Sequence, residues 1–297
     1  MPYNYSIPET FRNKVFLFCM DTFSNKHNPY GSGNYLDTFW EEIHAMLRYR
    51  HGRLSLVPAA EYSNPGRASV IYLLSCKDEE FIDFIEYIFR VECLSHVTQN
   101  ENELVEEINQ LISSEGLGYE LTDFVKERRI ESTQFGDNQE VIVTVAWPQI
   151  IVKENQAMHS TAIKPVLVLL GDPGYKTANT EYLESLEDYR KEKWGDSLTK
   201  CCSSFESVMK IVCEKKKWKY SQSDTASPLI KTIIMKGGLE SHYEQPLAYI
   251  AALRNKYSTA HGAGVKPKNV TKNIALLGIN LTAAAILFLA NEFKINK

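Results

Sequence analysis

The sequence lacks an excess of basic residues. Its 297 residues include 33 lysines and arginines against 37 aspartates and glutamates, which gives a formal net charge of −4. Proteins that coat nucleic acid usually carry a positive surplus, because lysine and arginine neutralise phosphates. The composition therefore argues against tight, non-specific nucleic-acid binding over the whole surface. It remains compatible with an enzyme that engages a short RNA through a local patch.

Metal-binding cysteine motifs and a phosphate loop are also missing. None of the six cysteines forms a Cys-x-x-Cys pair, and histidines do not cluster around them at metal spacing, which argues against a zinc site. We expect reduced thiols packed in the core of a cytoplasmic protein. The turn from Gly171 to Gly174 is not followed by the Gly-Lys-Ser/Thr that a phosphate loop requires.

Long apolar runs are scarce. The N-terminus shows no basic stretch followed by an apolar one, so we expect no secretory signal. Residues 274–290 form the one membrane-like segment, but they number 17 and include Asn280 and Thr282. A membrane span needs about 20 apolar residues. We therefore predict a buried bundle helix and no membrane partner, with a C-terminal anchor as the alternative.

The length allows two domains at roughly 100–200 residues each. Residues 1–125 predict a helical N-terminal domain, for which we expect a role in sensing, in regulation or in adding to an RNA cleft. Its first helix begins near Ser6-Ile7-Pro8, a cap candidate followed by an early proline. Asn, Pro and Gly make residues 25–33 a loop. Apolar residues at helical spacing predict further helices over residues 36–49, 78–91 and 101–113.

Composition changes near Gly118. Residues 126–156 predict a β-containing connector, because residues 141–145 alternate and are β-branched and residues 150–152 are similar. Turn residues 136–138 separate residues 133–135 from residue 141, which predicts a small β-hairpin. Residues 157–297 predict an antiparallel helical bundle, since long amphipathic segments are joined by short turn-rich loops. The helices expected in this bundle cover residues 167–170, 179–193, 196–216, 227–235, 246–257 and 269–294. The fold class is thus mainly α.

The stretch from Leu253 to Gly262 brings together an arginine, an amide and a histidine. Asn255 directly follows Arg254, and His261 lies seven positions after Arg254. Seven residues are close to two helical turns, so both side chains can face one way. The glycine after the histidine can end the helix. A purely structural reading, with both residues on the surface or at a helix end, remains open.

These groups suit cleavage of an RNA phosphodiester by its own 2′-hydroxyl. The attacking hydroxyl needs a proton acceptor and the departing 5′-oxygen needs a donor, and histidine can serve either role near neutral pH. Charge that builds on the phosphoryl oxygens is met bidentately by arginine. Because the RNA supplies its own nucleophile, we expect no metal and no cofactor. The sequence also shows no cluster of Asp and Glu of the kind that a metal nuclease uses.

The segment Arg254-Asn255-x5-His261-Gly262 resembles the R-x(4–6)-H signature of the HEPN superfamily. Its surroundings look like the abortive-infection C-terminal domain, a branch of that superfamily. The stretch from Asp196 to Lys210 is similar to the family's second conserved helix, and the apolar final helix over residues 273–293 also fits. The resemblance covers roughly residues 157–297.

The upstream half resembles, more loosely, the N-terminal domain often fused to that domain in phage-defence proteins. The residues that suggest it are Ile7-Pro8-x3-Arg12, Phe39-Trp40, Asp83-x2-Glu86-x2-Phe89 and Gly116-x-Gly118-Tyr119.

Together the resemblances imply a toxin-like endoribonuclease of antiviral defence, a hydrolase that leaves a 2′,3′-cyclic phosphate. They imply a homodimer or higher homo-oligomer in which two motifs build one cleft. RNA is the implied substrate, with tRNA as a candidate, and a phage trigger or an antitoxin is the expected control. Carried over by position, Arg254 and His261 are the catalytic pair and Asn255 is a polar auxiliary.

Secondary candidates for RNA contacts are Glu206, Lys210, Lys256, Lys266 and Lys268. Glu206 and Lys210 lie four apart and could instead form an ordinary helical ion pair. The basic cluster over residues 48–53 is a candidate sensing or RNA surface. Two rival interpretations remain: a non-catalytic helical module that binds RNA or protein, and the toxin half of a toxin–antitoxin pair.

Overall fold

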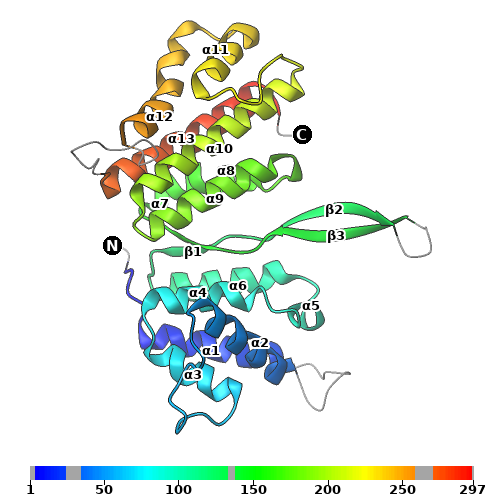
Figure 1. The fold of residues 1–297 in the computed structure, drawn as a ribbon, viewed down its shortest axis with the longest axis vertical. Coiled ribbons are helices and arrows are strands. Elements are labelled where there is room, and N and C mark those ends of the chain that lie inside the picture. Colours follow the sequence, from blue (N-terminus) through cyan, green and yellow to red (C-terminus); the bar gives the residue numbers. More distant parts are fainter. Residues whose placement is uncertain (1–3, 25–34, 133–137, 258–269, 296–297) are drawn as a thin grey trace. The chain divides into compact units, whose positions relative to one another are not determined.

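The computed structural model describes residues 4–24, 35–132, 138–257 and 270–295 (Figure 1). The chain forms two compact units. The N-terminal unit comprises Met1–Phe124 and Trp147–Ile151, and the C-terminal unit comprises Val125–Ala146 and Val152–Lys297. Both consist mostly of helices, which confirms the predicted mainly α class. The segment over residues 25–33, predicted as a loop, lies outside the described residues.

The N-terminal unit contains six helices among its described residues. They are α1 (Glu9–Ser24), α2 (Tyr35–Arg50), α3 (Pro65–Ser75), α4 (Asp78–Ile88), α5 (Leu94–Val97) and α6 (Glu101–Ser114). Helices α1, α2, α4 and α6 were predicted, whereas α3 and the short α5 were not. A start signal for α3 is nevertheless present, because the Asn64 side chain accepts a hydrogen bond from the Arg67 backbone N–H and Pro65 occupies the first turn.

Aromatic side chains fill the core of this unit. The rings of Phe23 and Phe39 stack with centroids 4.1 Å apart, and Trp40 stacks on Phe84 at 6.0 Å. Such rings bury large apolar areas and account for much of the packing between α1, α2 and α4. Phe39 and Trp40, which carry part of the N-terminal resemblance, are therefore core residues.

Other residues of that resemblance hold the backbone in place. The Glu86 carboxylate accepts a hydrogen bond from the Ile150 backbone N–H at 2.9 Å, and the Tyr119 hydroxyl donates to the Tyr5 carbonyl at 2.9 Å. Gly116 has a φ of +65°, in the left-handed region that favours glycine. These positions serve the fold of the unit.

Among the described residues, four strands make two small sheets. Strand β1 (Tyr119–Leu121) pairs with β4 (Ile150–Val152), and β2 (Val125–Ser132) forms an antiparallel hairpin with β3 (Asn138–Ala146). The hairpin was predicted with residues 133–135 before its turn. The structure shows β2 over the preceding residues, and residues 133–135 themselves lie outside the described residues. The sequence of β2 is rich in charge, Val-Lys-Glu-Arg-Arg-Ile-Glu-Ser, so it lacks the apolar pattern of a half-buried strand.

The C-terminal unit contains the predicted bundle. Its helices are α7 (Gln156–Met158), α8 (Lys164–Leu170), α9 (Lys176–Arg190), α10 (Trp194–Lys215), α11 (Ala226–Gly237), α12 (Glu244–Tyr257) and α13 (Lys272–Glu292). A π-helical turn, His159–Ile163, links α7 to α8 and was not predicted. The six helices that the sequence predicted correspond to α8 through α13.

Helix α10 is the centre of this unit, since it contacts α9, α11, α12 and α13 (Figure 1). Its buried stripe includes Leu198, Cys202, Phe205 and Met209. Helix α13 has the length and apolarity of a membrane span by composition alone, and half of its most apolar stretch is buried within the protein. Its contacts with α10 and α8 are those of a bundle helix, as predicted.

A close approach between α13 and α10 gives a first prediction. A Cβ built on Gly278 would lie 2.3 Å from Cδ2 of the buried Leu198. Gly278→Val should therefore destabilise the protein by about 1–3 kcal/mol through overpacking, as measured by denaturant unfolding. Ala284→Val, at an exposed position of α13, is the matched control and should change stability little. Leu198→Ala should cost less in the Gly278→Val background than in the wild type; equal costs would contradict this account.

Candidate active site

Arg254 lies in the last turn of α12, at the edge of that helix's buried face. Leu247, Ile250 and Leu253 pack inward at helical spacing. This places the neighbouring Arg254 half inside the protein, with 23% of its side chain exposed. Asn255 and Lys256, the next two residues, are exposed.

The guanidinium of Arg254 is held by Glu206 of α10. Nη1 of Arg254 lies 3.1 Å from Oε1 of Glu206, whose side chain is 14% exposed. The same Oε1 atom accepts the backbone N–H of Ala226, the first residue of α11, at 2.9 Å, and it lies 3.7 Å from Sγ of Cys202. The Glu206 carboxylate of α10 thus contacts both α11 and α12, and it holds the Arg254 guanidinium in position.

The Arg254 guanidinium makes one further hydrogen bond and can donate more. Its Nε donates to Oδ1 of Asn255 at 3.3 Å, so the polar residue that follows it helps to orient the guanidinium. Among the described residues, no hydrogen bond or ion pair involves Nη2 of Arg254. Part of the donor fork therefore remains available for an oxyanion.

The surroundings of this contact are acidic. Burial, together with the nearby Glu206 carboxylate, raises the pKa of the Cys202 thiol to about 12, so the thiol stays protonated. Burial also raises the pKa of Glu181 on α9, whose carboxylate accepts a hydrogen bond from the Ser207 hydroxyl. These carboxylates would repel phosphate, so Arg254 is the group on this face suited to attract it.

Lys210 and Lys256, the other predicted RNA contacts that the structure describes, make contacts of their own. Lys210 donates to the Gln222 carbonyl at 2.8 Å, so it does not form the helical ion pair considered for it and Glu206. Lys256 lies over the ring of the adjacent Tyr257. His261, Lys266 and Lys268 lie outside the described residues.

The sequence had offered Glu206 as an RNA contact and had not predicted its pairing with Arg254, which is 48 positions away. A signal was available. Glu206 borders the apolar stripe of α10, between the buried residues Phe205 and Val208, and carboxylates are seldom buried without a partner. That pattern predicts a cationic partner, but it does not say which one.

The basic cluster after α2 is paired with acidic residues of α4. Nε of Arg50 lies 3.2 Å from Asp83, and Glu80 lies 3.7 Å from Arg53 and 3.9 Å from His51. This pairing offsets the charge that an RNA surface would need.

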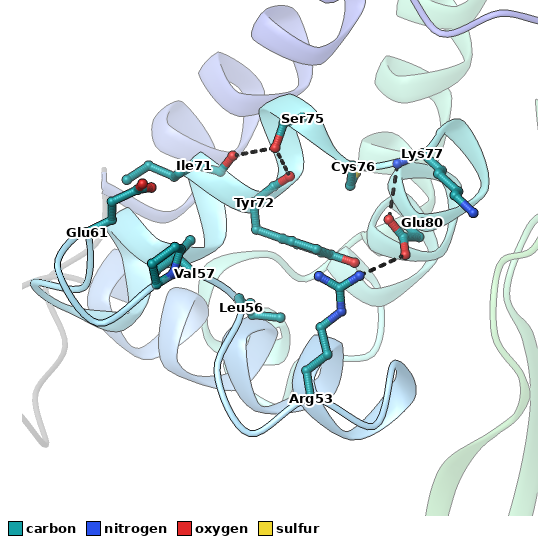
Figure 2. A pocket seen from close by; sticks show the side chains of 11 residues that line it. Arg53, Leu56, Val57, Glu61, Ile71, Tyr72, Ser75, Cys76, Lys77 and Glu80 are labelled. Carbon is teal, nitrogen blue, oxygen red and sulfur yellow. Dashed lines mark hydrogen bonds and ion pairs between the residues drawn. The ribbon is translucent and has the colours of Figure 1, made fainter.

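A cavity of about 380 Å³ adjoins this cluster within the N-terminal unit (Figure 2). Figure 2 shows the Arg53 guanidinium between Tyr72 and Glu80, and it lies 4.9 Å from the centre of the Tyr72 ring. Leu56, Val57 and Ile71 form the apolar part of the lining. The volume falls in the range of small-molecule sites, about 300–1,000 Å³.

The described parts of the chain contain no group of three or more His, Cys, Asp or Glu side chains that could hold a metal ion. The six cysteines are free, and five of them are buried. This agrees with the packed thiols predicted from the sequence.

The bundle α9–α13, with α10 at its centre, defines a HEPN-like helical domain. The family model that matches it is Abi_C, a HEPN-like domain, over residues 176–293. The match starts at the first residue of α9 and includes Glu206, Arg254 and His261. It assigns the C-terminal domain to the abortive-infection branch that the sequence resembled. Comparisons with curated proteins and with solved structures found no match.

Proposed function

We propose that this protein is a metal-independent endoribonuclease of abortive infection. The observation that carries the proposal is Arg254 within the region matched by Abi_C: it is anchored by Glu206 and retains an available edge of its guanidinium. A fixed arginine next to a histidine-bearing segment suits a reaction that develops negative charge on a phosphoryl group.

The proposed reaction is transesterification within the RNA. The imidazole of His261 takes the proton of the 2′-hydroxyl, and the 2′-oxygen forms a bond to phosphorus. The bond from phosphorus to the 5′-oxygen breaks, and a second imidazole protonates the departing oxygen. Arg254 neutralises the phosphoryl oxygens, and the products are a 2′,3′-cyclic phosphate and a 5′-hydroxyl.

Two imidazoles imply two protomers, so the proposed enzyme is a homodimer or a higher homo-oligomer. Its substrate is RNA, with tRNA as the first candidate, and it acts in the cytoplasm as a toxin that stops phage growth. Such an enzyme must be silent in a healthy cell. A phage trigger or an antitoxin is therefore part of the proposal, with the N-terminal unit as the regulatory element.

The test is RNA cleavage in the presence of EDTA. Purified protein incubated with total RNA and with tRNA should cleave equally with and without the chelator, because no step uses a metal. The new 3′ ends should resist direct ligation and become ligatable after the cyclic phosphate is opened and removed. Loss of cleavage in EDTA, or products with free 3′-hydroxyls, would contradict the mechanism.

A non-catalytic binding module is the second candidate. The observation that favours it is the Arg254–Glu206 ion pair itself, since both side chains are largely buried and could simply brace α10, α11 and α12. In that case no RNA would be cleaved under any condition, and Arg254→Ala would lower stability without removing a catalytic activity.

A further inference from the structure

The β2–β3 hairpin is a two-stranded ribbon with no third strand among the described residues. In Figure 1 it extends beyond the helices of the C-terminal unit. Its base contacts the short 3₁₀ turn Pro173–Tyr175 of the same unit. Isolated two-stranded hairpins are marginally stable in water and gain stability when another surface covers one face. A further surface that covers one face of the distal ribbon would therefore stabilise it.

One face of the ribbon carries two exposed isoleucines among charged side chains. Ile130 is 74% exposed and Ile142 is 67% exposed. In the register of the hairpin, Arg128 lies opposite Ile142 and Ile130 lies opposite Glu140, so all four side chains share one face. The contact between Arg128 and Glu140, 3.5 Å across the strands, confirms that these two side chains are on the same side.

The charge of the ribbon argues against nucleic acid as the occupant of this face. Residues 125–146 contain three basic and four acidic side chains. On the opposite face, Arg129 is paired with Glu127 at 2.9 Å. Phosphate-binding surfaces need a cationic surplus, and this ribbon has none. A protein surface that offers both apolar and complementary charged groups fits better.

The arrangement of the four side chains is self-complementary. They stand at the corners of a rough rectangle, with the two isoleucines on one diagonal and Arg128 and Glu140 on the other. A two-fold axis along the isoleucine diagonal would bring each isoleucine onto its own counterpart. The same rotation would bring each Arg128 onto Glu140 of a second copy. Closed two-fold contacts require such a pattern, and a steep crossing of two ribbons is an accepted packing of sheets.

We propose that this face of the β2–β3 hairpin binds the same face of a second copy of the chain. The two isoleucine pairs form the apolar centre of the contact, and two Arg128–Glu140 pairs flank it. The contact supplies the second protomer that the proposed ribonuclease needs, so in that respect it rests on the proposed function. It adds the surface by which the two copies recognise each other.

Cross-linking tests the two-fold geometry. Ile142→Cys places a thiol next to its own counterpart, so mild oxidation should give a disulfide-linked dimer on a non-reducing gel. Val141→Cys, one residue away on the opposite face, is the matched control and should cross-link much less. Wild type gives the background from the native cysteines. Equal cross-linking of the two variants would overturn the proposal.

Charge reversal tests the flanking pairs. Arg128→Glu and Glu140→Arg should each raise the dimer dissociation constant at least tenfold in analytical ultracentrifugation, because each places like charges together. The double variant should recover dimerisation. Both positions are well exposed, so the fold should persist, and circular dichroism checks this. A dimer that is unchanged in every variant would overturn the hairpin contact while leaving the ribonuclease proposal intact. Cross-linking of Ile142→Cys without RNA cleavage would support the hairpin contact and contradict the ribonuclease proposal.

Discussion

Arg254→Ala should reduce the rate of RNA cleavage by about 100- to 1,000-fold, the usual effect of removing one donor that stabilises transition-state charge. Among the described residues, the Arg254 guanidinium contacts Glu206 and Asn255. Neither of these side chains can supply the positive charge that the variant lacks. His261→Ala should cause a loss of similar size, because the imidazole carries the protons.

The measurement is initial cleavage rate on tRNA in EDTA, with growth inhibition scored in parallel. Lys231→Ala is the matched control, since it removes an exposed positive charge from α11 in the same unit. It should leave the rate unchanged. Arg254→Lys should recover only part of the activity, because an ammonium group cannot donate bidentately. Cleavage that persists at the wild-type rate in Arg254→Ala would place the activity elsewhere.

Glu206 acts through Arg254 and is expected to be a positioning residue. In Glu206→Gln the amide oxygen can still accept the Ala226 N–H, while the ionic contact with the arginine is lost. The loss of activity should be smaller than for Arg254→Ala and should appear mainly in kcat, because the guanidinium is displaced rather than removed. An unchanged fold with an unchanged rate would show that the carboxylate does not position the arginine.

Periodicity predicted those parts of the fold in which one face is buried and the other is solvated. Helix α10 is the clearest case, since its stripe through Phe205 and Met209 appears both in the sequence and in the core. Helix α3 was missed because it is short and contains Gly66, Arg67 and Ser69 among its apolar residues. The extent of strand β2 was not predicted because both faces of the ribbon carry charge, so alternation is absent.

In the candidate site, too, the sequence predicted some features and not others. Arg254 and Asn255 were identified from a local pattern, and local patterns can be read directly from the sequence. The pairing of Arg254 with Glu206 depends on how α10 and α12 pack, and no local rule gives that packing. The same holds for the shared carboxylate contact with α11. The sequence therefore indicated which side chains are candidates for the chemistry, and the structure showed the contact with Glu206 that positions Arg254.

Arg12 illustrates the same point in the N-terminal unit and gives the second large expected effect. The sequence offered it as part of a family resemblance, and the structure gives it a physical role. Its Nη1 donates to the Leu73 carbonyl at 2.6 Å, and its Nη2 donates to the Cys76 carbonyl at 3.1 Å and to Asp78 at 2.8 Å. The guanidinium also lies 4.6 Å from the centre of the Phe81 ring.

Arg12→Ala should therefore destabilise the N-terminal unit by about 3–5 kcal/mol, as expected when a buried, fully bonded charge is removed. The carbonyls at the end of α3 would lose their donors, and α1 would lose one of its contacts with the start of α4. Arg12→Lys should recover little, because one ammonium group cannot reach three separate acceptors. Lys14→Ala, on the same helix, removes an exposed ion pair with Glu115 and should change stability little. Denaturant unfolding of the full chain measures all three variants, and equal midpoints for Arg12→Ala and Lys14→Ala would show that the buried contacts of Arg12 do not stabilise the unit.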